Sequence, residues 1–130
     1  MLRQVATAAL LSALFVGSPV HAEEEVGRWK GFKSGSTEDF KVKAPWILDW
    51  RINTDVPQAM SIEISLINAI SGFRDGVVLK SKYRGNGVKL FNQDGRFRFR
   101  VDSAFTNWDL KVRQLTPEEA ALYTPRREEE

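Results

Sequence analysis

Apolar and polar residues alternate along most of the chain between residues 40 and 113. A period of two places apolar side chains on one face of a β-strand and polar side chains on the other. Turn-forming Gly, Asn, Asp and Pro residues interrupt the pattern about every 8–12 residues, which indicates about seven short strands. They are expected at residues 40–43, 46–52, 62–66, 77–84, 88–90, 96–102 and 108–113. The pattern predicts an all-β fold, a single antiparallel two-sheet β-sandwich that is jelly-roll-like.

Two segments also fit a helix. Residues 60–72 place apolar side chains at helical spacing, but four isoleucines within them favour a strand. Residues 116–123 begin with Thr116, a good N-cap, and Pro117, which suits the first helical position. We therefore expect a strand in the first segment and a short helix in the second.

The last two predicted strands can be paired as a hairpin. A connection at residues 103–106 sets Val101 opposite Trp108 and Phe99 opposite Leu110. Both pairs are apolar and would share the buried face, as cross-strand neighbours in a sheet commonly do. The sequence therefore favours direct pairing of these two strands.

The other face of the same hairpin would be strongly basic. In this register Arg98 meets Lys111 and Arg96 meets Arg113. Like charges on neighbouring strands cost stability unless an anion or an acidic segment covers them. The candidate binding residues on this face are Arg96, Arg98, Arg100, Lys111 and Arg113.

Basic residues are concentrated in the predicted sandwich and acidic residues in its flanks. Residues 40–115 hold 13 Lys and Arg against 7 Asp and Glu, whereas residues 23–39 and 116–130 together hold 5 basic and 10 acidic residues. Three interpretations fit this distribution. Outward Lys and Arg can protect solubility and sheet edges. The acidic flanks can fold back over the basic sheet, or the sheet can bind an anionic partner.

The N-terminal flank carries a second candidate site. We assign residues 23–39 to an N-terminal segment, residues 40–115 to the β-sandwich core, and residues 116–130 to a short helix and acidic tail. Trp29 and Phe32 lie among cations in the first of these segments. Aromatic rings beside cations can stack on sugars, which makes the pair a candidate glycan platform. Alternatively, they belong to a first strand and pack on the core.

The first 22 residues have the three parts of a secretory signal peptide. Arg3 supplies a positive charge, residues 5–16 form an uncharged apolar run, and Val20, His21 and Ala22 fit a signal-peptidase site. The run is shorter than the roughly 20 residues that span a bilayer, so no transmembrane segment is expected in the mature chain. We therefore expect export to the periplasm or the extracellular space.

The chemistry available to the mature domain is narrow. The chain contains no Cys, and its single His, His21, belongs to the expected signal peptide. Ser-His-Asp and Cys-His catalysis, thiolate chemistry and the usual zinc and copper sites all need one of these residues. We therefore expect no enzymatic activity and no cofactor, and we expect no nucleic-acid partner.

Two patterns of core residues are shared with a known class of proteins. They are Phe40-x-Val42 with Trp46-x-Leu48-x-Trp50, and Gly95-x-Phe97-x-Phe99-x-Val101 with Trp108-x-Leu110-x-Val112. In these patterns residues 40–112 resemble small exported bacterial β-sandwich proteins. Most proteins of that kind are uncharacterised, so the resemblance implies the fold and transfers no functional residue.

The sequence leads to two functional hypotheses. The first is a non-catalytic exported binding or structural protein of the bacterial envelope. Its basic sheet face would contact an anionic glycan, a lipid headgroup or an envelope protein. The alternative is a glycan-binding module that uses exposed aromatic side chains. Ionic strength separates the two, because salt screens contacts between charges but not stacking on neutral sugars.

Export can be tested directly. Cleavage after Ala22 would give a mature chain that begins at Glu23. N-terminal sequencing of the protein recovered from the cell envelope should read Glu-Glu-Glu-Val. Recovery of a cytosolic species that retains Met1 would contradict the assignment.

Overall fold

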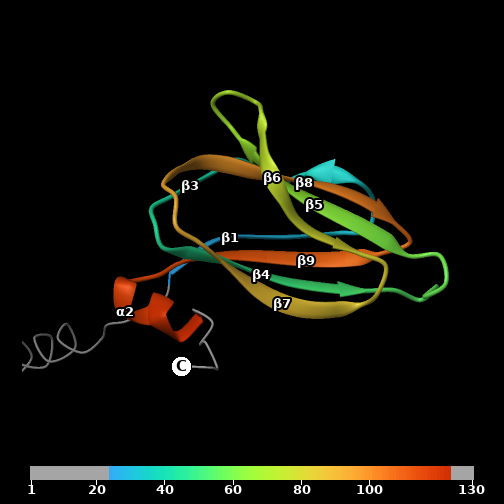
Figure 1. Ribbon diagram of the computed structural model, residues 1–130. Helices are drawn as coiled ribbons and strands as arrows, with labels where there is room; N and C mark the ends of the chain where they lie inside the picture. The colour runs from blue at the N-terminus through green and yellow to red at the C-terminus, as the bar shows by residue number, and fades with distance from the viewer. Residues whose placement is uncertain (1–23, 124–130) are drawn as a thin grey trace, which may run out of the picture.

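Two antiparallel sheets pack face to face (Figure 1). The structure, a computed structural model, describes residues 24–123. In sheet A the strand order is β1 (Glu24–Gly31), β9 (Asn107–Gln114), β4 (Trp46–Asn53) and β7 (Gly85–Phe91). In sheet B, β2 (Gly35–Ser36) and β3 (Phe40–Val42) pair with β8 (Gly95–Ala104), which is followed by β5 (Ser61–Asn68) and β6 (Arg74–Ser81). The expected all-β sandwich is confirmed.

The strand pairs are nested in the sequence. β1 pairs with β9, β2 and β3 pair with β8, β4 pairs with β7, and β5 pairs with β6. Two further pairs, β4 with β9 and β5 with β8, join these hairpins side by side. A long antiparallel ribbon wound in this way is a jelly roll. The segment with the ambiguous pattern forms β5, as predicted.

The predicted C-terminal helix is also present, and it is short. α2 (Pro117–Ala120) follows Thr116, whose hydroxyl accepts from the backbone N–H of Glu119 at 3.2 Å. The Glu119 carboxylate accepts from the Thr116 N–H at 2.8 Å, which completes a capping box. The 3-10 turn η1 (Ala121–Tyr123) comes next and contacts β7. The acidic tail from residue 124 onward, like the signal peptide and Glu23, lies outside the described residues.

Aromatic side chains from both sheets meet in the core, at the end of the sandwich where β3 and β4 begin. Trp46 of sheet A lies 5.8 Å from Phe97 and 5.6 Å from Phe40 of sheet B, between ring centroids, and stacks on Phe91 at 4.1 Å. Phe40 also contacts Phe99 at 5.3 Å. Large aromatic contacts of this kind contribute packing energy that a domain without Cys cannot obtain from disulfides.

The N-terminal segment is part of the sandwich, which corrects its placement ahead of a core that starts at residue 40. β1 pairs with β9 along seven register positions, with a bulge between Glu25 and Gly27. The sequence concealed this strand because two of its inward positions, Gly27 and Gly31, carry no side chain. Their space is filled by aromatic rings instead, since a Cβ at Gly31 would lie 2.4 Å from the ring of Trp108.

The predicted pairing of the last two strands is wrong. β8 lies in sheet B and β9 in sheet A, so Phe99 and Leu110 enter the shared core from opposite sheets and are not neighbours in one sheet. The connection between the strands is only Phe105 and Thr106. Phe105 has a positive φ of 54°, and the buried Thr106 hydroxyl lies within hydrogen-bond distance of the Ser61 and Ala104 carbonyls. Alternation identifies an inward face, but it does not tell side-by-side strands from strands that face each other.

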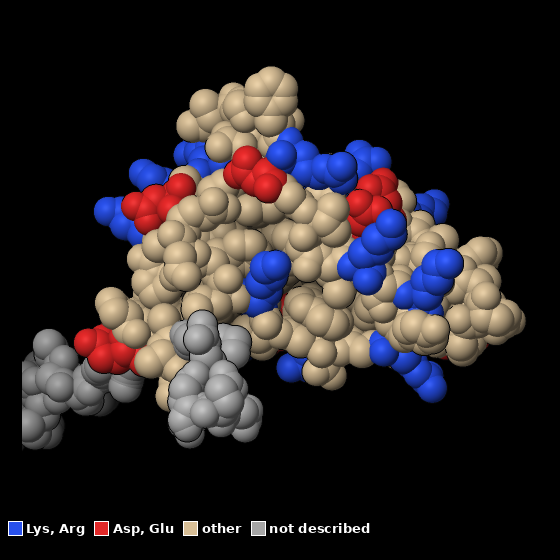
Figure 2. Space-filling view, viewed as in Figure 1, with Lys and Arg blue, Asp and Glu red and all other residues tan. Residues whose placement is uncertain are grey.

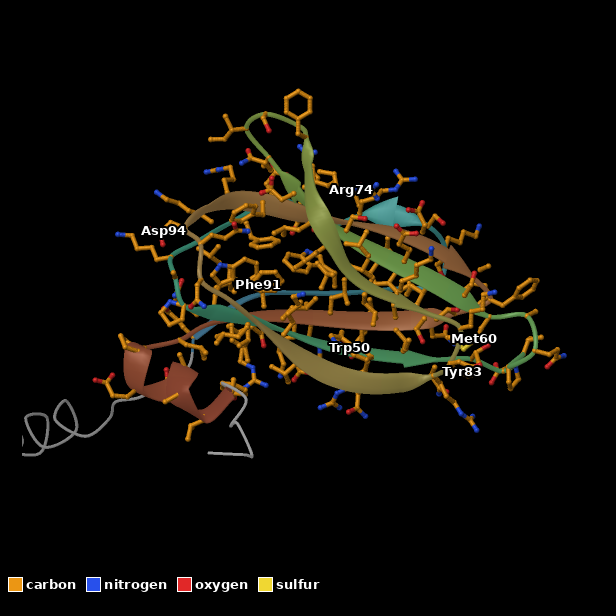
Figure 3. The ribbon with its side chains drawn as sticks, in the orientation of Figure 1. Trp50, Met60, Arg74, Tyr83, Phe91 and Asp94 are labelled. Carbon is orange, nitrogen blue, oxygen red and sulfur yellow. The ribbon has the colours of Figure 1, made fainter. Side chains whose placement is uncertain are left out.

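Glycine is required where an edge strand passes beneath a tryptophan. Gly87 of β7 is paired with Trp50 of β4, and a Cβ at Gly87 would lie 2.6 Å from the Trp50 ring. Trp50, labelled on sheet A in Figure 3, is partly buried and packs against the core. Gly85, two residues earlier on the same strand, has nothing within 4 Å of its Cβ position.

This difference predicts opposite effects for the same substitution. Gly87→Ala should lower the free energy of unfolding by about 1–3 kcal/mol, because the indole must leave its position. Gly85→Ala, the matched control, should leave it unchanged or raise it by a few tenths of a kcal/mol, roughly, because the unfolded chain loses freedom. Urea unfolding of both variants measures the effect, and equal midpoints would contradict the Trp50–Gly87 contact.

Candidate binding groove on the outer face of sheet A

The outward side chains of β1, β9 and β4 form polar rows across sheet A. The register places Lys30, Asp109 and Arg51 in one row, at neighbouring positions on the three strands. At the end of the sheet, Asn107 of β9 is paired with Asn53 of β4. These residues alternate with inward apolar residues along each strand, so the strand period alone directs them outward.

The next row is held by ion pairs. Arg28 of β1 donates from Nη2 and Nε to the two carboxylate oxygens of Asp109, at 2.9 and 3.2 Å. Asp49 of β4 accepts from Arg113 at 3.0 Å and lies 3.9 Å from Arg51. A two-point contact between guanidinium and carboxylate fixes the orientation of both groups. The outer face of sheet A is therefore ordered before any ligand arrives.

The Arg28–Asp109 pair also shifts both titrations. The hydrogen bond from Arg28 is the main cause that lowers the pKa of the Asp109 carboxyl, and the charge of Arg28 acts in the same direction. The same bond, with the charge of Asp109, raises the pKa of Arg28. Asp109 thus remains an ionised acceptor at neutral pH.

A hollow of about 520 Å³ lies over these rows. Its lining includes Phe32, Asn53 and Asn107 at one end and Lys30, Arg51 and Asp109 beyond them. A smaller hollow of about 160 Å³ shares Arg51 and Asp109 and continues to Arg28, Asp49 and Lys111. We call the two together the sheet A groove.

Phe32 forms an aromatic wall of the groove. Phe32 is 49% exposed, so part of its ring is accessible to a ligand. The backbone around it is held in place, because Ser103 donates from its hydroxyl to the Phe32 carbonyl at 3.0 Å. The indole of Trp108 donates to the carbonyl of the next residue, Lys33, at 3.1 Å. The ring is therefore presented by an anchored loop.

The groove combines the groups that hold a sugar. An exposed aromatic ring can stack on the apolar face of a pyranose, and the Asn amides can donate to and accept from its hydroxyls. Guanidinium and ammonium groups bind carboxylate or phosphate substituents. Asp109 adds a charged acceptor for hydroxyl groups.

A second hollow, of about 500 Å³, lies at the same end of the molecule over sheet B. Its lining includes Tyr83, Lys80, Glu63 and Asp102. Figure 3 shows Tyr83 at this end, near Met60, with Asp94 at the opposite end. Tyr83 stands on the turn between β6 and β7, and no hydrogen bond from its hydroxyl is found within residues 24–123. Lys80, Glu63 and Asp102 are also aligned across neighbouring strands, and Glu63 and Asp102 pair with Arg74 and Arg100. Unlike the sheet A groove, this hollow has no Asn side chains in its lining.

The five cations predicted to form one basic face lie on opposite faces of the sandwich. Arg96, Arg98 and Arg100 project from β8 on sheet B, whereas Lys111 and Arg113 project from β9 on sheet A. The reason is the strand assignment, since β8 and β9 belong to different sheets. The single basic face is therefore wrong.

Three of those five cations also have acidic partners. Arg98 contacts Asp39 at 2.9 Å, Arg100 contacts Asp102 at 3.2 Å, and Arg113 contacts Asp49 at 3.0 Å. These carboxylates come from the sheets and from the connection before β3. Asp39 belongs to the N-terminal acidic flank, so this flank supplies one of the partners on β8. The C-terminal acidic tail from residue 124 onward lies outside the described residues.

The two predicted aromatic site residues, Trp29 and Phe32, lie in different surroundings. Trp29 is packed against the core, 5.5 Å from Phe40 between ring centroids, and its indole donates to Glu38 at 3.3 Å. It belongs to a first strand, which was the alternative interpretation. Phe32 instead lines the groove. Sequence reasoning missed Lys30, Asn53 and Asn107, because their outward alternation is visible but the order β1-β9-β4 is not.

Three general observations complete the description of the site. Within residues 24–123, no three His, Cys, Asp or Glu side chains come together in a way that could hold a metal ion. No helix in that range is long and apolar enough to cross a membrane. No protein-family model and no curated protein sequence matches the chain.

The Arg28–Asp109 pair predicts that the stability lost in an Arg28→Gln variant depends on pH. Arg28→Gln should raise the pKa of Asp109 toward its ordinary value. Because folding lowers this pKa, the pair stabilises the protein above the unfolded-state pKa of about 4, and the effect is lost as the pH falls through the lowered pKa. Unfolding free energies of wild type and variant should therefore differ at neutral pH and converge in acid.

Carbon-13 NMR titration of the Asp109 carboxyl, with urea unfolding at both pH extremes, measures this. Lys41→Gln, which removes a cation from the other sheet, serves as the control. An Asp109 pKa that is equal in wild type and Arg28→Gln would refute the pair.

Proposed function

We propose that this protein is a non-catalytic exported binding protein that holds an anionic glycan in the sheet A groove. The observation that carries the proposal is the half-exposed Phe32 beside two aligned Asn side chains and an ordered row of charges. The Phe32 ring can stack on the apolar face of a sugar ring, and the neighbouring Asn side chains can bind its hydroxyl groups.

The charge of the groove favours an anionic ligand. Four cations line its two hollows, whereas the carboxylates there are Asp49 and Asp109. Lys30 and Lys111 form no ion pair with an acidic side chain within residues 24–123. Uronic acids and phosphorylated sugars offer the anionic groups that such cations bind. A glycan fits this groove better than a lipid headgroup or a flat protein surface, because its lining sets the apolar side chains of Phe32, Ile52 and Trp108 beside amide and charged groups.

The electrostatics of the groove support binding rather than catalysis. Glycoside hydrolysis needs one carboxyl group whose pKa is raised so that it can donate a proton. The pKa of Asp109 is lowered instead, and Asp49 accepts from Arg113. The sequence beyond residue 22 has neither His nor Cys to supply another base or nucleophile.

Export is the part of the proposal that rests on sequence alone. The signal-peptide pattern of residues 1–22 supports delivery to the periplasm or the extracellular space. Acidic glycans and phosphorylated polysaccharides are available there. The proposed role is therefore contact with a component of the bacterial envelope.

Removal of the aromatic wall tests the proposal. The mature protein is run in native gels that contain polygalacturonate, alginate or lipopolysaccharide, with dextran as the neutral control. At least one anionic polymer should retard the wild type, and added salt should weaken the effect. Phe32→Ala should weaken the affinity about tenfold, since one stacking contact contributes about 1.4 kcal/mol.

The matched control is Phe73→Ala, which removes an exposed Phe at the other end of the molecule and is compared on polygalacturonate and alginate, which carry no acyl chains. It should be retarded as strongly as the wild type. Equal retardation of Phe32→Ala and the wild type, or no retardation by any of the three polymers, would refute the groove as a glycan site.

A further inference from the structure

A loop with an apolar tip projects from the opposite end of the sandwich. It joins β5 to β6 and rises above sheet B in Figure 1, where it forms the uncharged projection at the top of Figure 2. Ile70 is 82% exposed and Phe73 is 74% exposed, although both are strongly apolar. This loop is separate from the sheet A groove, which lies at the other end and on the other face.

The loop is ordered by its own hydrogen bonds. Asn68 accepts through its side-chain oxygen from the N–H groups of Ile70 at 2.9 Å and Ser71 at 3.1 Å. Its backbone carbonyl accepts from Gly72 at 2.8 Å, and Gly72 has the positive φ of 80° that glycine tolerates. The Ser71 hydroxyl accepts from the Phe73 N–H at 3.1 Å. Ile70 and Phe73 are therefore held in solvent by a defined turn.

Cations surround the base of this loop, and we call Lys41, Arg74, Arg96 and Arg98 the basic collar. The Ala69 N–H donates to the Arg96 carbonyl at 2.9 Å, and Arg96 is paired with Lys41 of β3. Arg74 and Arg98 flank Ile67 on neighbouring strands.

Acidic side chains balance only half of the collar. Arg98 pairs with Asp39 at 2.9 Å and Arg74 with Glu63 at 3.4 Å. In the part of the chain that the structure describes, no acidic side chain forms an ion pair with Lys41 or Arg96. Asp75 follows Arg74 but lines a hollow with Leu66 and Phe91 on the other side of β6.

We propose that this loop docks on an anionic phospholipid bilayer. Ile70 and Phe73 enter the interface between headgroups and acyl chains, and the basic collar lies against the phosphates. Apolar side chains gain free energy at that depth, and each cation near an anionic surface adds to the attraction. This proposal does not depend on the glycan groove.

The shape of the tip favours lipid over a protein partner. Two apolar side chains on a narrow projecting turn offer a convex surface with little area. A stable protein interface buries about 800 Å² on each partner and needs a complementary pocket for such a tip. A bilayer accepts a convex apolar tip without a preformed pocket, and the adjacent collar supplies charge complementarity.

Vesicle co-sedimentation tests the apolar contact. The mature protein is mixed with vesicles of phosphatidylglycerol and phosphatidylcholine, and separately with pure phosphatidylcholine. Wild type should pellet with the anionic vesicles and much less with the neutral ones. Ile70→Ser/Phe73→Ser should weaken vesicle affinity at least about tenfold, because two apolar side chains no longer leave water.

Leu122→Ser is the matched control, because Leu122 is an 80% exposed apolar residue on η1. It should pellet like the wild type. Both variants alter exposed side chains, so unchanged urea midpoints should accompany the result. Failure of the wild type to pellet with anionic vesicles, or equal pelleting of the double variant, would overturn the proposal and leave a protein partner as the alternative for this tip.

The collar is tested separately. Lys41→Gln/Arg96→Gln should weaken binding to the anionic vesicles about tenfold or more and flatten its salt dependence. Lys33→Gln/Lys82→Gln removes the same charge at the far end and should keep wild-type affinity. Equal losses of vesicle affinity in the two double variants would show that only the net charge of the protein matters, and would overturn docking through the β5–β6 loop. Ile70→Ser/Phe73→Ser should still bind anionic polysaccharide, so a loss of vesicle binding can be told apart from a loss of glycan binding in the sheet A groove.

Discussion

The contact of Trp46 with Phe40 and Phe97 is the interaction on which the rest of the structure depends. It joins the two sheets at the end of the core where β4 begins, in a chain that has no Cys and therefore no disulfide to join them. Because the inner faces must meet across this cluster, the apolar sides of β8 and β9 lie opposite each other. The outward side chains of β8 and β9 therefore lie on two different faces of the molecule.

That division explains what the sequence could and could not predict. The period of two located β3 to β9 and their inward residues, because burial acts on each strand separately. The predicted pairing of β8 with β9 was wrong because alternation shows only that Phe99 and Leu110 point inward. It does not show whether their strands are neighbours in one sheet or belong to opposite sheets. The predicted pairing also placed Arg98 next to Lys111, and the repulsion between these like charges argues against that pairing. β1 was expected only through the interpretation that Trp29 belongs to a first strand, because Gly27 and Gly31 interrupt its apolar alternation.

The candidate site shows the same limit. Phe32 could be singled out as an aromatic residue among cations, but its partners could not. Lys30, Asp109 and Arg51 lie far apart in the chain and meet only because β1, β9 and β4 are neighbours in this order. The nested jelly-roll pairing thus creates both the ordered polar face of sheet A and, at the other end, the exposed turn between β5 and β6.

We propose that the outer face of sheet A, rather than a basic face on β8, receives an anionic glycan. An NMR titration of the nitrogen-15-labelled mature protein with oligogalacturonate addresses this most directly. We expect the largest changes in amide chemical shift at Lys30, Asn53 and Asn107, and the side-chain amides of both Asn residues should shift as well. Changes centred on Arg96 to Arg100 of β8, or none at saturating ligand, would contradict it.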